Sequence, residues 1–502
     1  MQMKKASKYR YFAFLLAVST VLITFGSMCS FLFPVHTGVD QNVFFTIGES
    51  LLDGKVMYRD AWDQKGPLLY FMHTFAALFS RNTFFGVYLL EIVNLFVVLL
   101  YVGKISDLFL ERKHRNLVVA LTGLITITTY CFSRGDNAEE FCMPFLVIGL
   151  YHMICYLNSE EKQFSNKLMI LHGIFAACIL WIKFTMLGFY IGWCLLIGLT
   201  LWNRKQFKYA IYAALYFLLG MLLGTLPYLI YFMATGAMED FYFGAIYSNV
   251  FMYSRKVKFM KRIEYFFMQD ILFNPVMMPL TLLGVTVLTA SKKWLGNITA
   301  RSSIAVTYIS TYVFVFIGGT RYKYYLLIMA AYTVFGVMVG VKYFESSIEK
   351  MRQHKKAWVS GCIVVFMVAL LAFSNVMPYF FKKWEEYPQL QFAKIINESE
   401  DKTLMNYNFL DGGFYLMADA PLPKTKYFCR PNFPREAFPE LYEEQEAAIK
   451  NKETEFVVMR YGRNRILEEF VTCKELYQNY QLVATSYDEV DDYYFALLKR
   501  KK

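Results

Sequence analysis

Two acidic segments of this mostly apolar sequence carry side chains suited to chemistry. HTGVDQN contains Asp40, and SRGDNAEEF contains Asp136, Glu139 and Glu140. A carboxylate held in a fixed place can act as a general base that removes a proton from a hydroxyl group. A plainer interpretation exists for each: an acid after a membrane helix is often a solvated boundary residue, and an acid at a helix start is favoured by the helix dipole.

Several basic residues accompany these acids. They are Lys65 in WDQKGPLL, Lys183 in WIKF, and Arg321 and Lys323 in GGTRYKYYLL. Clustered cations bind phosphate oxygens strongly, because charge-assisted hydrogen bonds are stronger than neutral ones. Acids together with cations therefore suit a reaction in which a hydroxyl is deprotonated and a phosphate leaves.

Other kinds of chemistry have weaker support in the sequence. We find no Walker-type phosphate loop, which argues against transport driven by ATP, and no His or Cys cluster with metal-ligand spacing. The expected reaction requires no nucleotide and no metal. A divalent ion held by Asp40 with Glu139 or Glu140 remains an alternative, since carboxylates ligate such ions.

The elements that must position these residues are membrane helices. The chain has 502 residues, of which 56% are hydrophobic, 19% aromatic and only 18% charged. Apolar runs of about twenty residues recur, which is the length that crosses a bilayer. The net charge of +12 does not indicate nucleic-acid binding, because the lysines and arginines fall mostly in short clusters between the apolar runs. The sequence predicts a polytopic α-helical membrane protein.

The basic clusters also predict the topology. The N-terminal segment MQMKKASKYR is basic and no cleavage site follows the first apolar run, so we expect a cytoplasmic N-terminus and a retained first helix. About eleven spans place the C-terminus outside the cell membrane. The predicted spans are residues 11–33, 84–110, 117–132, 141–157, 168–182, 184–202, 209–234, 266–290, 303–318, 324–343 and 358–378.

One basic segment opposes this topology. YSRKVKFMKR carries Arg255, Lys256, Lys258, Lys261 and Arg262 on the side predicted to be external. It could form an interfacial helix whose lysines reach the lipid headgroups. Alternatively, it could help to gather an anionic lipid phosphate.

The sequence predicts two domains. Residues 1–378 form a transmembrane domain whose first outer loop, residues 34–83, alternates acids with Phe44, Phe45 and Trp62 and is expected to lie along the membrane surface. Residues 379–502 form a small extracytoplasmic α/β domain. Its predicted strands are residues 403–408, 455–460, 481–487 and 493–499, and its predicted helices lie near 392–398 and 440–451. A disulfide between Cys429 and Cys473 is possible there.

The order of these pieces resembles a known superfamily. A first helix is followed by an Asp, then by GESLLDGKVMYRDAWDQKGPLLY, an acidic DNAEE loop and a late basic-aromatic RYKYYLL. This order is similar to that of the GT-C glycosyltransferases that use lipid-linked sugars, in the branch near the protein O-mannosyltransferases and aminoarabinose transferases. The resemblance covers residues 10–380, and residues 38–69 are its most specific part.

The resemblance implies a reaction and roles. A sugar would pass from a polyprenyl-phosphate donor to an acceptor on the outer face by a single inverting displacement, building a cell-envelope glycan. Asp40 matches the acidic residue of the first outer loop that activates the acceptor. Glu139 and Glu140 match a second acidic position that orients the acceptor or the sugar. Lys65, Arg321 and Lys323 match the groups that bind the donor phosphate, although Lys323 stands where a histidine often precedes the Tyr-Tyr pair.

Two other classes of function stay open. A multi-pass transporter would place charges along a central pathway, and Glu91, Asn94 and Lys183 are polar residues within or beside the apolar runs. A non-catalytic lipid-glycan binding protein could share the same fold. The sequence leaves open which sugar is moved and whether the acceptor is a lipid, a polysaccharide or a protein.

Overall fold

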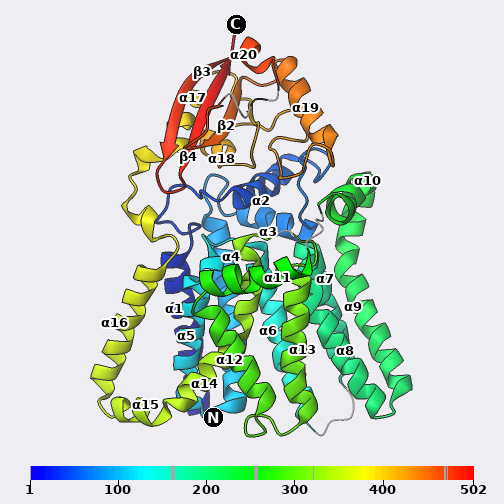
Figure 1. Cartoon of the computed structure of the whole chain (residues 1–502), viewed down its shortest axis with the longest axis vertical. Helices are drawn as coiled ribbons and strands as arrows, with labels where there is room; N and C mark the ends of the chain where they lie inside the picture. Colours follow the sequence, from blue (N-terminus) through cyan, green and yellow to red (C-terminus); the bar gives the residue numbers. More distant parts are fainter. Residues whose placement is uncertain (1, 160–163, 254–257, 320, 468–470, 472) are drawn as a thin grey trace. The chain divides into compact units, whose positions relative to one another are not determined.

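The structure is a computed structural model, and it describes residues 2–159, 164–253, 258–319, 321–467, 471 and 473–502 (Figure 1). The chain divides into two compact units, each assembled from separate stretches of sequence. Unit 1 comprises residues 1–27, 90–228 and 255–377, and unit 2 comprises residues 28–89, 229–254 and 378–502.

Unit 1 is a helical bundle whose long helices match the predicted spans. They are α1 (Gln2–Gly26), α4 (Phe85–Phe109), α5 (Arg115–Thr128), α6 (Ala138–Leu157), α7 (Asn166–Lys183), α8 (Gly188–Asn203), α9 (Phe207–Ala234), α12 (Met277–Ala290), α13 (Ile298–Val315), α14 (Thr333–Tyr343) and α16 (Lys355–Phe373). The shorter elements are η2 (Arg112–His114), η3 (Tyr130–Phe132), η4 (Phe184–Leu187), α11 (Phe259–Tyr265), η6 (Phe266–Ile271), η7 (Lys323–Tyr332) and α15 (Glu345–Arg352).

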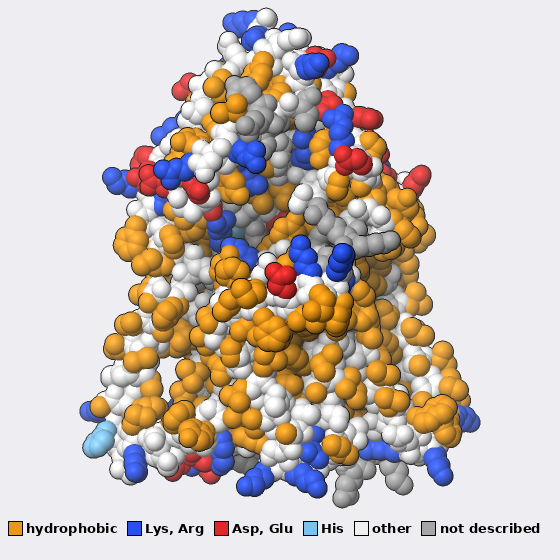
Figure 2. All heavy atoms as spheres, in the orientation of Figure 1, with side chains coloured by type: hydrophobic (Ala, Val, Ile, Leu, Met, Phe, Trp, Pro, Cys, Tyr) orange, Lys and Arg blue, Asp and Glu red, His pale blue; other side chains and the backbone are white. Residues whose placement is uncertain are grey.

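The long helices are suited to a bilayer. Within the described residues, seven helical segments are long and apolar enough to span a membrane. They are Lys8–Gly26, Phe85–Phe109, Ala138–Leu157, Asn166–Asn203, Phe207–Ala234, Lys323–Tyr343 and Lys355–Phe373. Hydrophobic side chains dominate the visible face of these helices (Figure 2). The expected polytopic membrane protein is thus confirmed, and the chain crosses the membrane several times.

Two predicted spans have different boundaries in the structure. The first was expected to reach residue 33, but α1 ends at Gly26, and the hydroxyl of Ser27 then donates to Glu91 at 2.7 Å. The span predicted at 266–290 is interrupted, because α12 begins only at Met277. Pro275 explains the interruption, since proline disfavours helical geometry in the residue before it and cannot donate a backbone hydrogen bond.

Glycines allow helices of unit 1 to pack closely. A Cβ atom added to Gly284 of α12 would lie 2.2 Å from the backbone nitrogen of Gly336 in α14, and one added to Gly336 would lie 2.1 Å from the oxygen of Leu280. Neither helix could hold a larger residue there without moving apart. Small residues at such crossings are typical of helix packing in membranes.

Unit 2 contains a sheet and short helices. The strands are β1 (Leu404–Asn406), β2 (Phe456–Gly462), β3 (Tyr480–Asp488) and β4 (Tyr493–Arg500). The order in the sheet is β1-β2-β4-β3, with β1 parallel to β2 and the other pairs antiparallel. The helical elements are α2 (Val39–Ser50), η1 (Leu51–Asp53), α3 (Pro67–Ala77), α10 (Met238–Phe241), η5 (Tyr242–Met252), η8 (Met377–Phe381), η9 (Trp384–Glu386), α17 (Pro388–Asn397), α18 (Phe414–Ala418), α19 (Pro439–Lys450) and α20 (Leu476–Asn479). The predicted C-terminal α/β fold is confirmed.

The outer-loop segment shares a core with the C-terminal segment in unit 2. The ring of Trp62 is buried, and its centroid lies 5.0 Å from that of Phe438 and 5.7 Å from that of Tyr427. The backbone N–H of Trp62 donates to the carbonyl of Lys426 at 3.0 Å. Our expectation that these aromatic side chains lie on a membrane surface was therefore wrong. They are buried inside the protein because aromatic partners from distant parts of the chain cover them.

Two further expectations concern unit 2. The possible disulfide is not formed, since Cys429 and Cys473 are both buried free thiols. The predicted domain boundary at residue 378 remains a prediction. Unit 2 joins residues 28–89 and 229–254 to residues 378–502.

Candidate active site

Asp40 lies in the first turn of α2 and is partly exposed. The chain before it is fixed by local hydrogen bonds. The backbone N–H of Gly38 donates to Nδ1 of His36 at 3.0 Å, and the side-chain amide of Asn42 donates to the carbonyls of His36 at 2.6 Å and Gly38 at 2.8 Å. Asp40 thus lies on a turn that these hydrogen bonds fix.

Lys65 is positioned just before α3, whose first helical residue is Pro67. Its carbonyl accepts a 2.6 Å hydrogen bond from the hydroxyl of Tyr58, and its N–H donates at 3.1 Å to the hydroxyl of Tyr70. The Tyr70 hydroxyl in turn donates to Asp63 at 2.7 Å. Burial, reinforced by Asp63, raises the pKa of Tyr58 and Tyr70 well above the usual value, so both phenols keep their protons. The backbone of Lys65 is therefore locked in place.

Lys65 contacts α2, the helix whose first turn contains Asp40. The Lys65 Nζ atom lies 5.4 Å from the centroid of the Phe44 ring. Phe44 is four residues after Asp40, and side chains with this spacing are neighbours on a helix, about 5 to 6 Å apart at Cβ. The ammonium group of Lys65 therefore contacts α2 at a residue one turn after Asp40.

The predicted acidic loop of unit 1 has an unusual backbone. Ser133, Gly135 and Asp136 have positive φ angles of 57°, 85° and 54°. The buried carboxylate of Glu91 holds this loop, because it accepts 2.8 Å and 2.7 Å hydrogen bonds from the Asp136 N–H and the Ser27 hydroxyl. Strained backbone of this kind persists where the surroundings fix it, and it is concentrated at functional sites. Glu91 was visible in the sequence as an acid within a span, but its partner was not.

Glu139 and Glu140 begin α6, and both are buried. Glu139 forms an ion pair with Lys183, the last residue of α7. The Lys183 Nζ atom also lies 3.4 Å from the centroid of the Tyr325 ring. Each of these two glutamates has one buried carboxylate oxygen without a hydrogen-bond partner among the described residues.

The basic pair of the late loop has mixed surroundings. Arg321 forms an ion pair with Asp270 of η6, and that carboxylate also accepts a 2.5 Å hydrogen bond from the Tyr312 hydroxyl. The Lys323 Nζ atom lies 4.9 Å from the centroid of the Tyr130 ring. Unit 1 therefore gathers Lys323 with aromatic side chains and binds Arg321 to an acid that sequence reasoning missed. Asp270 lies inside a predicted span, and this was the signal that could have revealed it.

The predicted basic segment lies partly outside the described residues, which exclude Arg255 and Lys256. Of the remainder, Lys258 precedes α11, whose side chains Phe259 and Met260 are 74% and 71% exposed. Exposed apolar side chains beside lysines are typical of an interfacial helix. This observation favours the interfacial interpretation without testing phosphate binding.

One group in the described parts of the chain has the spacing of a metal site. His114, Glu345 and Glu349 place ligand atoms within 4.8 Å of one another. However, Glu349 forms an ion pair with Lys113, and Glu345 forms one with Lys342 at 2.7 Å. His114 immediately precedes α5, whereas the acidic loop follows the other end of this helix. The 14 residues of α5 give it a length of about 21 Å, which separates the two sites. It is therefore not the carboxylate pair that we considered for a metal.

The fold is similar to those of two proteins of known structure. ArnT from Cupriavidus metallidurans, solved with undecaprenyl phosphate, matches with a TM-score of 0.61 and 13% identity over 98% of both chains. The apo state of the same protein matches with a TM-score of 0.58 and 11% identity, also over 98% of both chains. An Archaeoglobus fulgidus oligosaccharyltransferase, solved with Zn and sulfate, matches with a TM-score of 0.50 and 9% identity over 89% of this chain and 67% of that chain. The resemblance expected from the sequence is thus confirmed for the fold.

Most of the chain matches one known protein family. Residues 2–382 match the family model described as "competence-induced protein Ccs4 N-terminal domain". This match covers most of the chain, so the protein belongs to that family. A comparison with curated proteins gives no match.

Proposed function

We propose that this protein is a membrane glycosyltransferase that moves a sugar from a polyprenyl-phosphate donor to an acceptor on the outer face of the cell membrane. The observation that carries the proposal is the contact of the Lys65 ammonium group with Phe44, one turn of α2 after Asp40. A base beside a cation is what the reaction requires, since one removes a proton while the other stabilises the departing phosphate. The GT-C fold supports the same conclusion.

The proposed reaction is a single displacement. Asp40 accepts the proton of the acceptor hydroxyl, whose oxygen attacks the anomeric carbon of the sugar. The bond from this carbon to the phosphate oxygen breaks on the opposite face, and the configuration inverts. The phosphate keeps the electron pair and remains on the lipid, where Lys65 stabilises its negative charge. Correct positioning of the acceptor hydroxyl and the anomeric carbon accelerates the reaction in addition to the effect of the base.

We assign roles in the same reaction to residues of unit 1. Glu139 and Glu140 position the acceptor or sugar, and each keeps one buried carboxylate oxygen without a partner among the described residues. Lys323 and Arg321 bind the donor phosphate, and Arg321 is also paired with Asp270. No metal or other cofactor is part of this mechanism, although a divalent ion bound by Asp40 with Glu139 or Glu140 is the alternative that a chelator tests.

The test is transfer by the purified protein in reconstituted vesicles. Polyprenyl-phosphate donors carrying radiolabelled sugars are supplied with an envelope extract as acceptor, and the products are analysed for new glycosidic bonds. We expect label in a new glycoside. Label that enters the vesicles unchanged would instead indicate a transporter, and donor binding without either event would indicate a non-catalytic binding protein. Mass spectrometry of surface glycans from cells with and without the gene then identifies the sugar and acceptor.

A further inference from the structure

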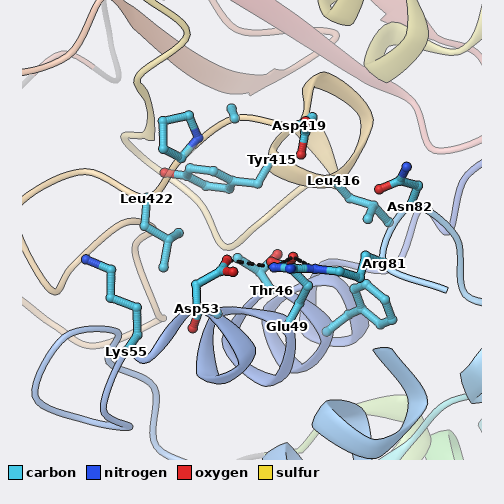
Figure 3. A pocket seen from close by; sticks show the side chains of 14 residues that line it. Thr46, Glu49, Asp53, Lys55, Arg81, Asn82, Tyr415, Leu416, Asp419 and Leu422 are labelled. Atoms are coloured by element: carbon cyan, nitrogen blue, oxygen red, sulfur yellow. Dashed lines mark hydrogen bonds and ion pairs between the residues drawn. The ribbon is translucent and has the colours of Figure 1, made fainter. Parts of the chain in front are cut away.

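A cavity of about 580 Å³ lies within unit 2, away from the first turn of α2 (Figure 3). One wall is the C-terminal half of α2 with the residues that follow it, and the other is α18 with residues 419–422. Its volume is within the range of about 300 to 1,000 Å³ typical of small-molecule sites. None of the roles assigned above uses this cavity.

An ionic network forms one side of the cavity. The guanidinium of Arg81 donates at 2.7 Å to Glu49 and at 2.7 Å to Asp53, and Figure 3 shows these contacts as dashed lines. The pKa of Glu49 is raised by burial, with a smaller contribution from the carboxylate of Asp419, despite the nearby Arg81. Asp419 therefore lies close enough to this network to interact with it.

Two charged side chains of the cavity make no hydrogen bond or ion pair with any residue that the structure describes. They are those of Lys55 and Asp419, and both are exposed. Asp419 projects from a backbone with a φ of 49°, in the left-handed region that costs energy for most residues. A donor and an acceptor are thus presented separately to the cavity, on opposite walls (Figure 3).

This lining selects a class of ligand. More than half of the lining side chains are polar or charged, whereas a lipid chain or a drug-like apolar ligand prefers a mostly apolar pocket. Sugar hydroxyls both donate and accept, so they can pair with ammonium, carboxylate, guanidinium and amide groups at once. The lining therefore fits a polyhydroxylated ligand better than the polyprenyl chain of a donor.

We propose that this cavity binds one or two saccharide units of the acceptor, which makes the acceptor a glycan. This inference rests on the function proposed above. Glu49 lies nine residues after Asp40 on α2, a rise of about 14 Å, so an acceptor of several sugar units is long enough to reach both. Lys55 and Asp419 are then residues that determine acceptor binding.

The experiment measures binding of the purified full-length protein in detergent to an array of mono- and oligosaccharides. We expect wild type to bind at least one saccharide series, and Lys55→Ala and Asp419→Gly each to weaken this binding at least tenfold. Glycine suits the positive φ at residue 419, so the second variant removes the carboxylate without straining the backbone. Lys394→Ala is the matched control, since Lys394 is an exposed residue of α17, and it should bind like wild type.

Two results would overturn the inference: wild type binds no saccharide, or both cavity variants bind as wild type does. Transfer by the same preparation separates this failure from that of the proposed function. If wild type transfers sugar but either of these two binding results is obtained, only the saccharide site is refuted. Binding that depends on Lys55 and Asp419 in a protein without any transfer would retain the saccharide site and refute its role as an acceptor site.

Discussion

Glu139 and Lys183 form an ion pair in which the glutamate is fully buried and the lysine is 9% exposed. This contact changes the expectation for Glu139, because a cation of the protein already neutralises the carboxylate. We predict that Glu139→Gln keeps transfer within about tenfold of wild type, since glutamine can still accept a hydrogen bond from Lys183. The measurement is the initial rate in reconstituted vesicles.

Chelation tests the alternative in which Glu139 is a metal ligand. If Glu139 or Glu140 held a divalent ion, EDTA would stop transfer and added metal would restore it. The initial rate of the Glu139→Gln variant would then be reduced far more than tenfold. We expect EDTA to leave the rate unchanged in wild type and in the variant. Reversible inactivation would replace the positioning role by a metal-ligand role.

Lys65→Ala should weaken donor use. Loss of a charged contact with the lipid phosphate costs about 1.5 to 3 kcal/mol, so the apparent KM for the donor should rise roughly tenfold to a hundredfold. The exposed Lys394→Ala serves as the control for loss of a positive charge in unit 2. A donor KM equal to that of the control would return Lys65 to a structural role.

The stability of unit 2 should depend on pH through Asp411. Burial raises the pKa of Asp411 to about 6, even though hydrogen bonds from Thr46 at 2.6 Å and Asn406 at 3.2 Å favour the ionised form. The unfolded value is about 3.9. Below pH 4 the group is protonated in both states, whereas above pH 6 it is ionised in both and the folded state contains a buried charge. This group's stabilising contribution is therefore lost as the pH rises through 6, by about 3 kcal/mol.

Asp411→Asn removes this titration. We expect the difference in unfolding free energy between the variant and wild type to shift in favour of the variant by about 3 kcal/mol between pH 4 and pH 7.5. Denaturant unfolding of both proteins in the same detergent measures this shift. A difference that stays constant with pH would mean that Asp411 titrates normally.

The proposed orientation is tested by labelling. We predict that cysteines placed at Asp53 or within residues 440–451 react in intact cells with a membrane-impermeant thiol reagent. Cysteines placed at Lys113 or Lys205 should react only after the cells are opened. The native cysteines are first replaced by alanine or serine. Labelling of the Lys113 or Lys205 positions in intact cells would invert the topology.

Much of the fold could be predicted because its signals are local. Apolar runs of bilayer length identified the helices of unit 1, and short apolar runs coincide with strands such as β2 and β4. The failures concern partners far apart in sequence. Trp62 packs on Tyr427 and Phe438, and no periodicity near residue 62 predicts those partners.

The same limit applies to the candidate site. The acid at Asp40 and the lysine before Gly66 and Pro67 could be singled out from short motifs, and the structure places both along α2. Asp270 could not be assigned to Arg321, because the pair joins residues 51 positions apart. The cavity beside Lys55 and Asp419 was equally hidden, since its walls come from three segments that meet only in the folded chain.

The most direct test of the central claim is the rate of sugar transfer by Asp40→Asn. Asparagine keeps the shape of the side chain but cannot accept the proton, so we predict a fall in kcat of about 100-fold to 10,000-fold. Unfolding temperature and donor binding should match wild type, and Glu398→Gln, which neutralises an exposed carboxylate at the end of α17, should keep the full rate. A folded Asp40→Asn protein that transfers sugar at the wild-type rate would contradict the assignment of Asp40 as the base.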